Sequence, residues 1–176
     1  MKVKLEAVDR FERDHRLRLP FRFGVITVTQ GIQAIIRVRI KLEDGRTSEG
    51  VAAEALGAKW FEKSPDFSDA QNLDQLRQAL QLAIDHYTAR GFDTPFGLYA
   101  GSYRQQIARG AELGLNPLVA SYGPALLDRA IIDAVGKATG QSFAQMIAAN
   151  VPGIAATDLT PDIDAGHLSG FLAGLK

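Results

Sequence analysis

The chain has 176 residues, with 20 basic and 20 acidic side chains, 46% hydrophobic residues and no cysteine. These values exclude a disordered chain, a collagen-like repeat and a disulfide scaffold, and the lack of cysteine excludes thiolate catalysis and cysteine-ligated metals. The start carries no apolar signal segment, and no apolar run approaches the roughly 18 residues of a membrane span. We therefore expect a cytoplasmic protein with one or slightly more than one domain and no membrane partner.

The N-terminal part alternates apolar and polar residues, which is the pattern of strands with one wet face. We predict strands over residues 2–13, 33–43 and 47–54, and the sequence EDGR at residues 43–46 supplies a tight turn between the last two. Such a run of short strands with a hairpin turn forms a three-stranded antiparallel meander.

The segment between the first two predicted strands, residues 17–29, is unusually apolar and is interrupted by Pro20, which cannot donate to a sheet ladder. We predict a loop here. Because loops run over the surface, a loop this apolar should cover something. Its apolar residues are Leu17, Leu19, Phe21, Phe23, Val25 and Ile26.

Residues 55–63 follow the third predicted strand and contain Lys59, the only tryptophan at Trp60, and Phe61. One interpretation is that Trp60 packs into a strand–helix junction. The other is that this segment is a second lid loop, which faces the same cavity as residues 17–29. A lysine beside an aromatic pair suits an anionic, partly apolar small molecule.

After residue 63 the apolar period changes to that of helices. Helix starts are indicated by capping-box patterns at Ser68 and Ser142 and by the Asn116–Pro117 pair. We predict helices from Ser68 to just before Gly91 and over residues 102–113, 124–139 and 143–150. The tail is predicted as a loop, with at most a short apolar turn at Leu168, Phe171, Leu172 and Leu175. Strands followed by helices predict an α+β fold, here a meander followed by a helical bundle.

Searches for familiar chemistry find little. The sequence has no glycine-rich phosphate loop, no nucleophile elbow, and no metal-ligand spacing among its three histidines. Lys2 and Lys4 are interpreted as exposed strand lysines. Arg37, Arg39 and Lys41 share a strand face without interleaved aromatic residues, so we expect no nucleic acid partner.

The order of these segments resembles a known family. The segments that carry the resemblance are PFRFG at residues 20–24, LEDG at residues 42–45, GVAAE at residues 50–54 and the helix at residues 130–143. Over residues 2–150, the chain resembles the N-terminal capping domain of the enolase superfamily, in its mandelate racemase and muconate lactonizing enzyme branch. The resemblance implies a capping domain at residues 1–122, and helices and a loop at residues 123–176 that lead toward a barrel.

In that family the capping domain closes the mouth of a modified TIM barrel. The barrel holds Mg²⁺ through three carboxylates, and a lysine or a His–Asp pair removes a proton α to a substrate carboxylate. The reactions are isomerisation or racemisation, cycloisomerisation and dehydration. The resemblance makes residues 17–29 and 55–63 the substrate-capping loops and implies substrate-binding roles for Phe21, Phe23, Lys59, Trp60 and Phe61.

A TIM barrel needs about 200–250 residues, but only 26 residues follow Asn150. We therefore expect no complete barrel, no catalytic or metal-binding residue and no cofactor in this chain, with Mg²⁺ belonging to a full-length family enzyme. A carboxylate substrate would bind only together with a barrel, and the chain as a truncated piece would be inactive alone.

Two alternatives remain from the residues themselves. The first is a stand-alone protein-interaction module that uses residues 17–29 and the apolar tail of Phe171, Leu172 and Leu175, with self-association to cover them. The second is a small-ligand-binding domain without catalysis.

Overall fold

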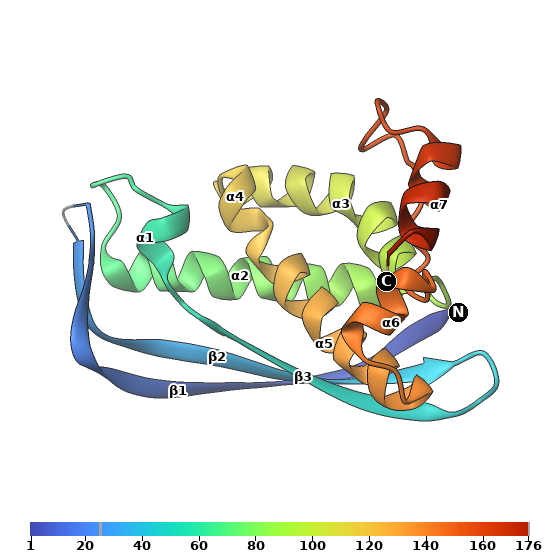
Figure 1. Cartoon of the computed structure of the whole chain (residues 1–176). Helices are drawn as coiled ribbons and strands as arrows, with labels where there is room; N and C mark the ends of the chain where they lie inside the picture. Colours follow the sequence, from blue (N-terminus) through green and yellow to red (C-terminus); the bar gives the residue numbers. More distant parts are fainter. Residues whose placement is uncertain (25, 176) are drawn as a thin grey trace.

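The computed structural model describes residues 1–24 and 26–175 (Figure 1). Three strands, β1 (Val3–Phe23), β2 (Ile26–Leu42) and β3 (Thr47–Ala55), form one antiparallel sheet in the order β1-β2-β3. Helices follow the sheet in the chain, so the predicted α+β fold class is confirmed. Within the described residues the sheet has three strands, and no complete TIM barrel is present.

The prediction of a loop over residues 17–29 is wrong, because the β1–β2 hairpin continues through this segment. Regular pairing runs to Arg16 opposite Gln30 and resumes at Phe21 opposite Val28. Between these pairs, residues 17–20 of β1 face the single residue Thr29, which makes a bulge. Pro20 lies in the bulge, where no ladder donor is needed, so its presence does not end the strand. Val25, which belongs to the predicted apolar segment, lies outside the described residues.

One face of the sheet carries the core. Alternate residues of β1 and β2 are buried: Val3, Leu5, Ile36, Val38 and Ile40. Helices α2 (Asp69–Ala89) and α5 (Tyr122–Thr139) pack over this face (Figure 1). Their buried apolar residues are Leu76, Ala79, Leu80, Ala83 and Tyr87 of α2, and Leu126, Leu127, Ala130, Ile131, Ala134 and Val135 of α5.

A glycine allows the close approach of α5 to the sheet. A Cβ atom on Gly50 of β3 would overlap the carbonyl oxygen of Ala130 and the amide nitrogen of Ala134. Gly123 of α5 does the same against α2, since its Cβ would overlap the carbonyl oxygen of Ala79. Both contacts bring backbone against backbone, so α5 is fixed to β3 on one side and to α2 on the other.

The predicted helix signals are mostly confirmed. Ser68 and Ser142 form complete capping boxes at the starts of α2 and α6 (Phe143–Ala148), and Asn116 caps the short α4 (Pro117–Ala120). Gly91 and Gly140 follow α2 and α5 with φ of 77° and 66°, a left-handed conformation that favours glycine.

Two helix predictions need correction. Helix α3 (Pro95–Glu112) begins before the predicted residue 102, because the Thr94 side chain accepts from the Gly97 amide and Pro95 suits the first helical position. The tail predicted as a loop contains α7 (Ala165–Ala173), which Asp164 caps by accepting from the amide of His167. Among the described residues no helix is both long enough and apolar enough to cross a bilayer.

Candidate functional site

The tip of the β1–β2 hairpin meets α1 (Ala58–Phe61), the single helical turn after β3 (Figure 1). The rings of Phe23 and Trp60 stack with centroids 4.2 Å apart and an interplanar angle of 11°. Phe21 lies 5.8 Å from Phe23, ring centroid to ring centroid. The structure therefore brings three of the five predicted site residues into one group, which we call the hairpin–α1 cluster (Phe21, Phe23 and Trp60).

The other two predicted residues lie beside this cluster in different settings. Phe61 turns inward and meets Tyr122 edge to face, with centroids 5.5 Å apart. Asn116 holds α1 in place by donating to the carbonyl oxygen of Phe61 and to the Glu62 carboxylate, both at 3.0 Å. Lys59 is half-buried. Phe61 thus anchors the turn, while the cluster faces outward.

The hairpin–α1 cluster presents aromatic surface to solvent. Half of Phe21 and 53% of Trp60 are exposed. Aromatic side chains of this size contribute strongly when a partner or ligand covers them. A substrate-binding role for the five residues stays a prediction, with an exposed aromatic surface as its physical basis.

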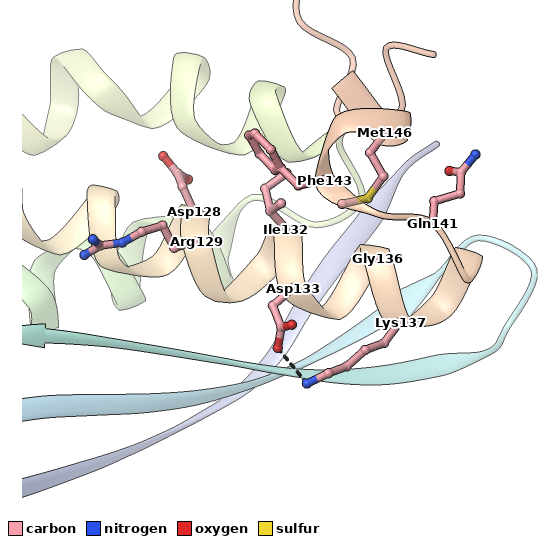
Figure 2. A pocket seen from close by; sticks show the side chains of 9 residues that line it. All are labelled: Asp128, Arg129, Ile132, Asp133, Gly136, Lys137, Gln141, Phe143 and Met146. Atoms are coloured by element: carbon pink, nitrogen blue, oxygen red, sulfur yellow. Dashed lines mark hydrogen bonds and ion pairs between the residues drawn. The ribbon is translucent and has the colours of Figure 1, made fainter. Parts of the chain in front are cut away.

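A second site lies along α5, where sequence analysis placed none. A cleft of about 560 Å³ runs between α5 and α6, and Figure 2 labels its nine lining residues. In that view Asp128, Ile132 and Phe143 lie on one side of α5, and the ion pair between Asp133 and Lys137 lies toward the sheet. Next to it, a smaller cavity of about 180 Å³ shares Asp128, Ile132 and Phe143 with the cleft.

Asp128 stands at the junction of the two cavities. Its Oδ1 accepts a hydrogen bond of 2.9 Å from the hydroxyl of Tyr87. Burial raises the pKa of the Asp128 carboxyl to about 7, and the Tyr87 hydrogen bond offsets only part of this rise. Burial, together with the nearby Asp128, also raises the pKa of the Tyr87 hydroxyl.

The cations near Asp128 are engaged elsewhere. Arg129 donates to Glu54 at 2.6 Å, and Lys137 donates to Asp133 at 2.6 Å. Among the described residues, Asp128 forms no ion pair. It is therefore an acid held in a partly apolar cleft without a cationic partner.

Sequence reasoning missed Asp128, although a signal was present. In LLDRAII, at residues 126–132, an acid interrupts the apolar stripe of an otherwise clear amphipathic helix. Acids on a buried stripe are uncommon unless they are paired. No group of three or more His, Asp or Glu side chains in residues 1–24 and 26–175 is placed to hold a metal ion.

Comparison with known proteins identifies the fold. No protein-family model and no curated protein sequence matches the chain. Among solved structures, an enolase from Bradyrhizobium complexed with magnesium and mandelic acid matches with a TM-score of 0.50 at 16% identity, over 80% of this chain and 33% of that one. An enolase from alpha proteobacterium BAL199 with bound magnesium has a TM-score of 0.49 at 15% identity, over 78% and 32%.

A mandelate racemase/muconate lactonizing protein from Herpetosiphon aurantiacus has a TM-score of 0.42 at 17% identity, over 77% and 32% of the two chains. At such identities the likeness concerns the fold, and the fold expected from the sequence resemblance is confirmed by the Bradyrhizobium enolase. The chain spans about a third of the length of that structure. It therefore has the fold of part of an enolase-type structure.

Proposed function

We propose that this chain is the substrate-capping part of an enolase-superfamily enzyme. The observation that carries the proposal is the shared fold with the Bradyrhizobium enolase, of which the chain matches 33%. Residues 1–122 would carry the capping role, and residues 123–176 would lead toward the barrel. Helix α5, which belongs to the second segment apart from Tyr122, packs on β3 and would join the cap to the segment that leads toward the barrel.

In this proposal the hairpin–α1 cluster forms an aromatic wall of the substrate cavity. Phe21 and Trp60 would lose their solvent exposure when the cavity closes, which excludes water from the reacting atoms. Lys59 would bring positive charge to the same wall and favour a carboxylate substrate. Phe61 would act by holding α1 against Tyr122, as its edge-to-face contact indicates.

The proton-abstracting groups and the magnesium site would lie in the rest of the enzyme. The Bradyrhizobium enolase is complexed with magnesium and mandelic acid. In this chain the described residues offer no fitting group of metal ligands. The enzyme's chemistry would be removal of a proton α to a carboxylate, followed by isomerisation, cycloisomerisation or dehydration.

The test compares the 176-residue chain with a longer protein. In the longer protein, an enolase-superfamily TIM barrel follows the C-terminal end of this chain. We expect Mg²⁺-dependent exchange of the α-proton of mandelate or another carboxylate only with the longer protein. In that protein, Trp60→Ala should raise KM about tenfold or more and change substrate preference. Leu118→Ala, at an exposed position of α4, is the matched control and should change neither. Proton exchange or tight Mg²⁺ binding by the 176-residue chain, measured by calorimetry, would overturn the proposal.

A second candidate function is self-association through exposed apolar side chains. Phe171 of α7 is 60% exposed and Leu19 of the hairpin is 68% exposed. Exposed apolar surface of this kind can mark interaction sites, but α7 and the hairpin tip lie at opposite ends of the molecule (Figure 1), so the two would form separate contacts. Sedimentation equilibrium distinguishes the two candidates, since a concentration-independent monomer argues against self-association and leaves the capping function untouched.

A further inference from the structure

The cleft beside α5 combines a carboxylate with an apolar cavity of ligand size. Asp128 lies where the larger cleft and the smaller cavity meet. The smaller cavity is lined by Phe96, Tyr99 and Phe143 together with aliphatic residues. The smaller cavity is partly open to solvent, and its volume of about 180 Å³ is similar to that of an apolar cavity of about 150 Å³ that accepts benzene. One aromatic ring therefore fits the smaller cavity, with its substituent next to Asp128.

The carboxylate of Asp128 determines which substituent on the aromatic ring would bind there. Asp128 is half-buried, and a carboxylate partly removed from water is costly unless it is paired. The Tyr87 hydroxyl satisfies one oxygen, Oδ1, and the described residues provide no cation for the group. An ammonium group placed at the larger cleft would supply the missing charge and retain access to water.

The larger cleft and the smaller cavity, which meet at Asp128, are together called the Asp128 cleft. We propose that the Asp128 cleft binds a small aromatic amine, with its ring in the smaller cavity and its ammonium group on the Asp128 carboxylate. The site differs from the hairpin–α1 cluster in residues and in place, so this inference does not depend on the capping function. It would give the domain a ligand of charge opposite to that of the proposed carboxylate substrate.

Binding should depend on pH because only the ionised carboxylate attracts the ammonium group. The titratable and charged groups around Asp128 are Tyr87 of α2, Tyr99 of α3, and Arg129, Asp133 and Lys137 of α5. Both tyrosines have raised pKa values and stay neutral near pH 7, and the other three are engaged in ion pairs. With a pKa of about 7 at Asp128, affinity should be about tenfold weaker at about pH 6 than at about pH 8.

Titration calorimetry of the 176-residue chain with benzylamine tests the proposal, with benzyl alcohol as a neutral probe of the same shape. We expect benzylamine to bind at least tenfold more tightly than benzyl alcohol at about pH 8. Asp128→Asn should remove that preference, while Tyr87 can still donate to the amide oxygen. Asp133→Asn is the matched control, because it removes an already paired carboxylate from the same cleft and should leave the preference in place.

A second variant keeps the test decisive if Asp128→Asn folds poorly. Phe143 lies on α6 with 65% of its surface exposed, so Phe143→Ala should fold normally. It should weaken benzylamine binding severalfold, since Phe143 lines both cavities. Equal affinities for benzylamine and benzyl alcohol, undiminished binding to either variant, or absence of benzylamine binding would each overturn the proposal.

Discussion

The indole of Trp60 stacks on the ring of Phe23 with centroids 4.2 Å apart, and this contact joins α1 to the tip of the β1–β2 hairpin. The hairpin beyond Val8 is largely exposed, so few other contacts hold its far end. Stacked aromatic pairs contribute about 0.5–1.5 kcal/mol beyond their buried area. In a double-mutant cycle with Phe23→Ala and Trp60→Ala, we expect a coupling of about 1 kcal/mol in the free energy of unfolding, measured by urea denaturation.

In the control cycle, Phe171→Ala takes the place of Phe23→Ala and is combined with Trp60→Ala. Phe171 is an exposed phenylalanine of α7, at the other end of the molecule from α1 (Figure 1). Mutations this far apart should be additive within about 0.5 kcal/mol. Hydrogen exchange should also speed up over residues 17–29 in both hairpin–α1 variants. Additive behaviour of Phe23→Ala and Trp60→Ala would contradict a stabilising stack.

Gly50 of β3 leaves no room for a side chain. A Cβ atom there would overlap backbone atoms of α5 at Ala130 and Ala134, and backbone cannot rotate away as a flexible side chain does. Overpacking a core costs typically about 1–3 kcal/mol, and we expect Gly50→Ala to reach about 3 kcal/mol or more. Urea denaturation measures the loss.

The matched control is Gly170→Ala in α7. A Cβ atom at Gly170 meets nothing within 4 Å, and alanine favours a helix interior over glycine. This variant should be as stable as the parent chain or slightly more stable. If both alanine variants behave alike, close packing between β3 and α5 is not what keeps a glycine at residue 50.

The sequence predicted those features that depend on local rules. Alternation in residues 36–42 and the capping boxes at Ser68 and Ser142 each involve neighbours within a few residues, and all are present in the structure. The loop prediction for residues 17–29 was wrong because Pro20 breaks a ladder only where a donor is required. Whether it is required depends on the register with the partner strand, which leaves Pro20 in a bulge of β1 opposite Thr29.

The two candidate sites show the same contrast between what local sequence patterns predict and what depends on tertiary contacts. That Phe23 and Trp60 share a cluster follows from the pairing of the whole hairpin, and their separation of 37 positions in the sequence gives no direct signal. Residues of α3, α5 and α6 together line the Asp128 cleft. A pattern within one helix could therefore mark Asp128 as unusual, but it could not show which residues surround it. The sequence analysis named Phe23 and Trp60 and missed Asp128, and tertiary contacts define the environment of all three.

Gln106 of α3 connects three backbone segments through a buried side chain. Its Nε2 donates to the carbonyl oxygens of Ala79 and Ala120, at 3.0 and 2.8 Å. Its Oε1 lies 3.0 Å from Nδ1 of His86, which must therefore carry the proton and donate. Gln106→Leu leaves these groups unpaired in the core and should cost at least about 2 kcal/mol of unfolding free energy.

The neighbouring residue provides the control for Gln106. Gln105 is exposed on the same helix, so Gln105→Leu should change stability by no more than about 0.5 kcal/mol. Thermal and urea unfolding of the two variants measure the difference. Equal stabilities would show that the three hydrogen bonds add nothing beyond the volume of the side chain.

Asp128 should make the chain less stable as pH rises toward neutrality. Its pKa is raised from 3.8 to about 7 by folding, so between these values the folded state holds a proton that the unfolded state has lost. The free energy of unfolding then falls by up to about 1.4 kcal/mol per pH unit, and by at most about 4 kcal/mol in total. Asp128→Asn removes this loss, so the variant should be more stable than the parent chain. This difference in stability should be larger at about pH 8 than at about pH 5. Urea midpoints at both pH values measure the difference, and a difference independent of pH would contradict a raised pKa at Asp128.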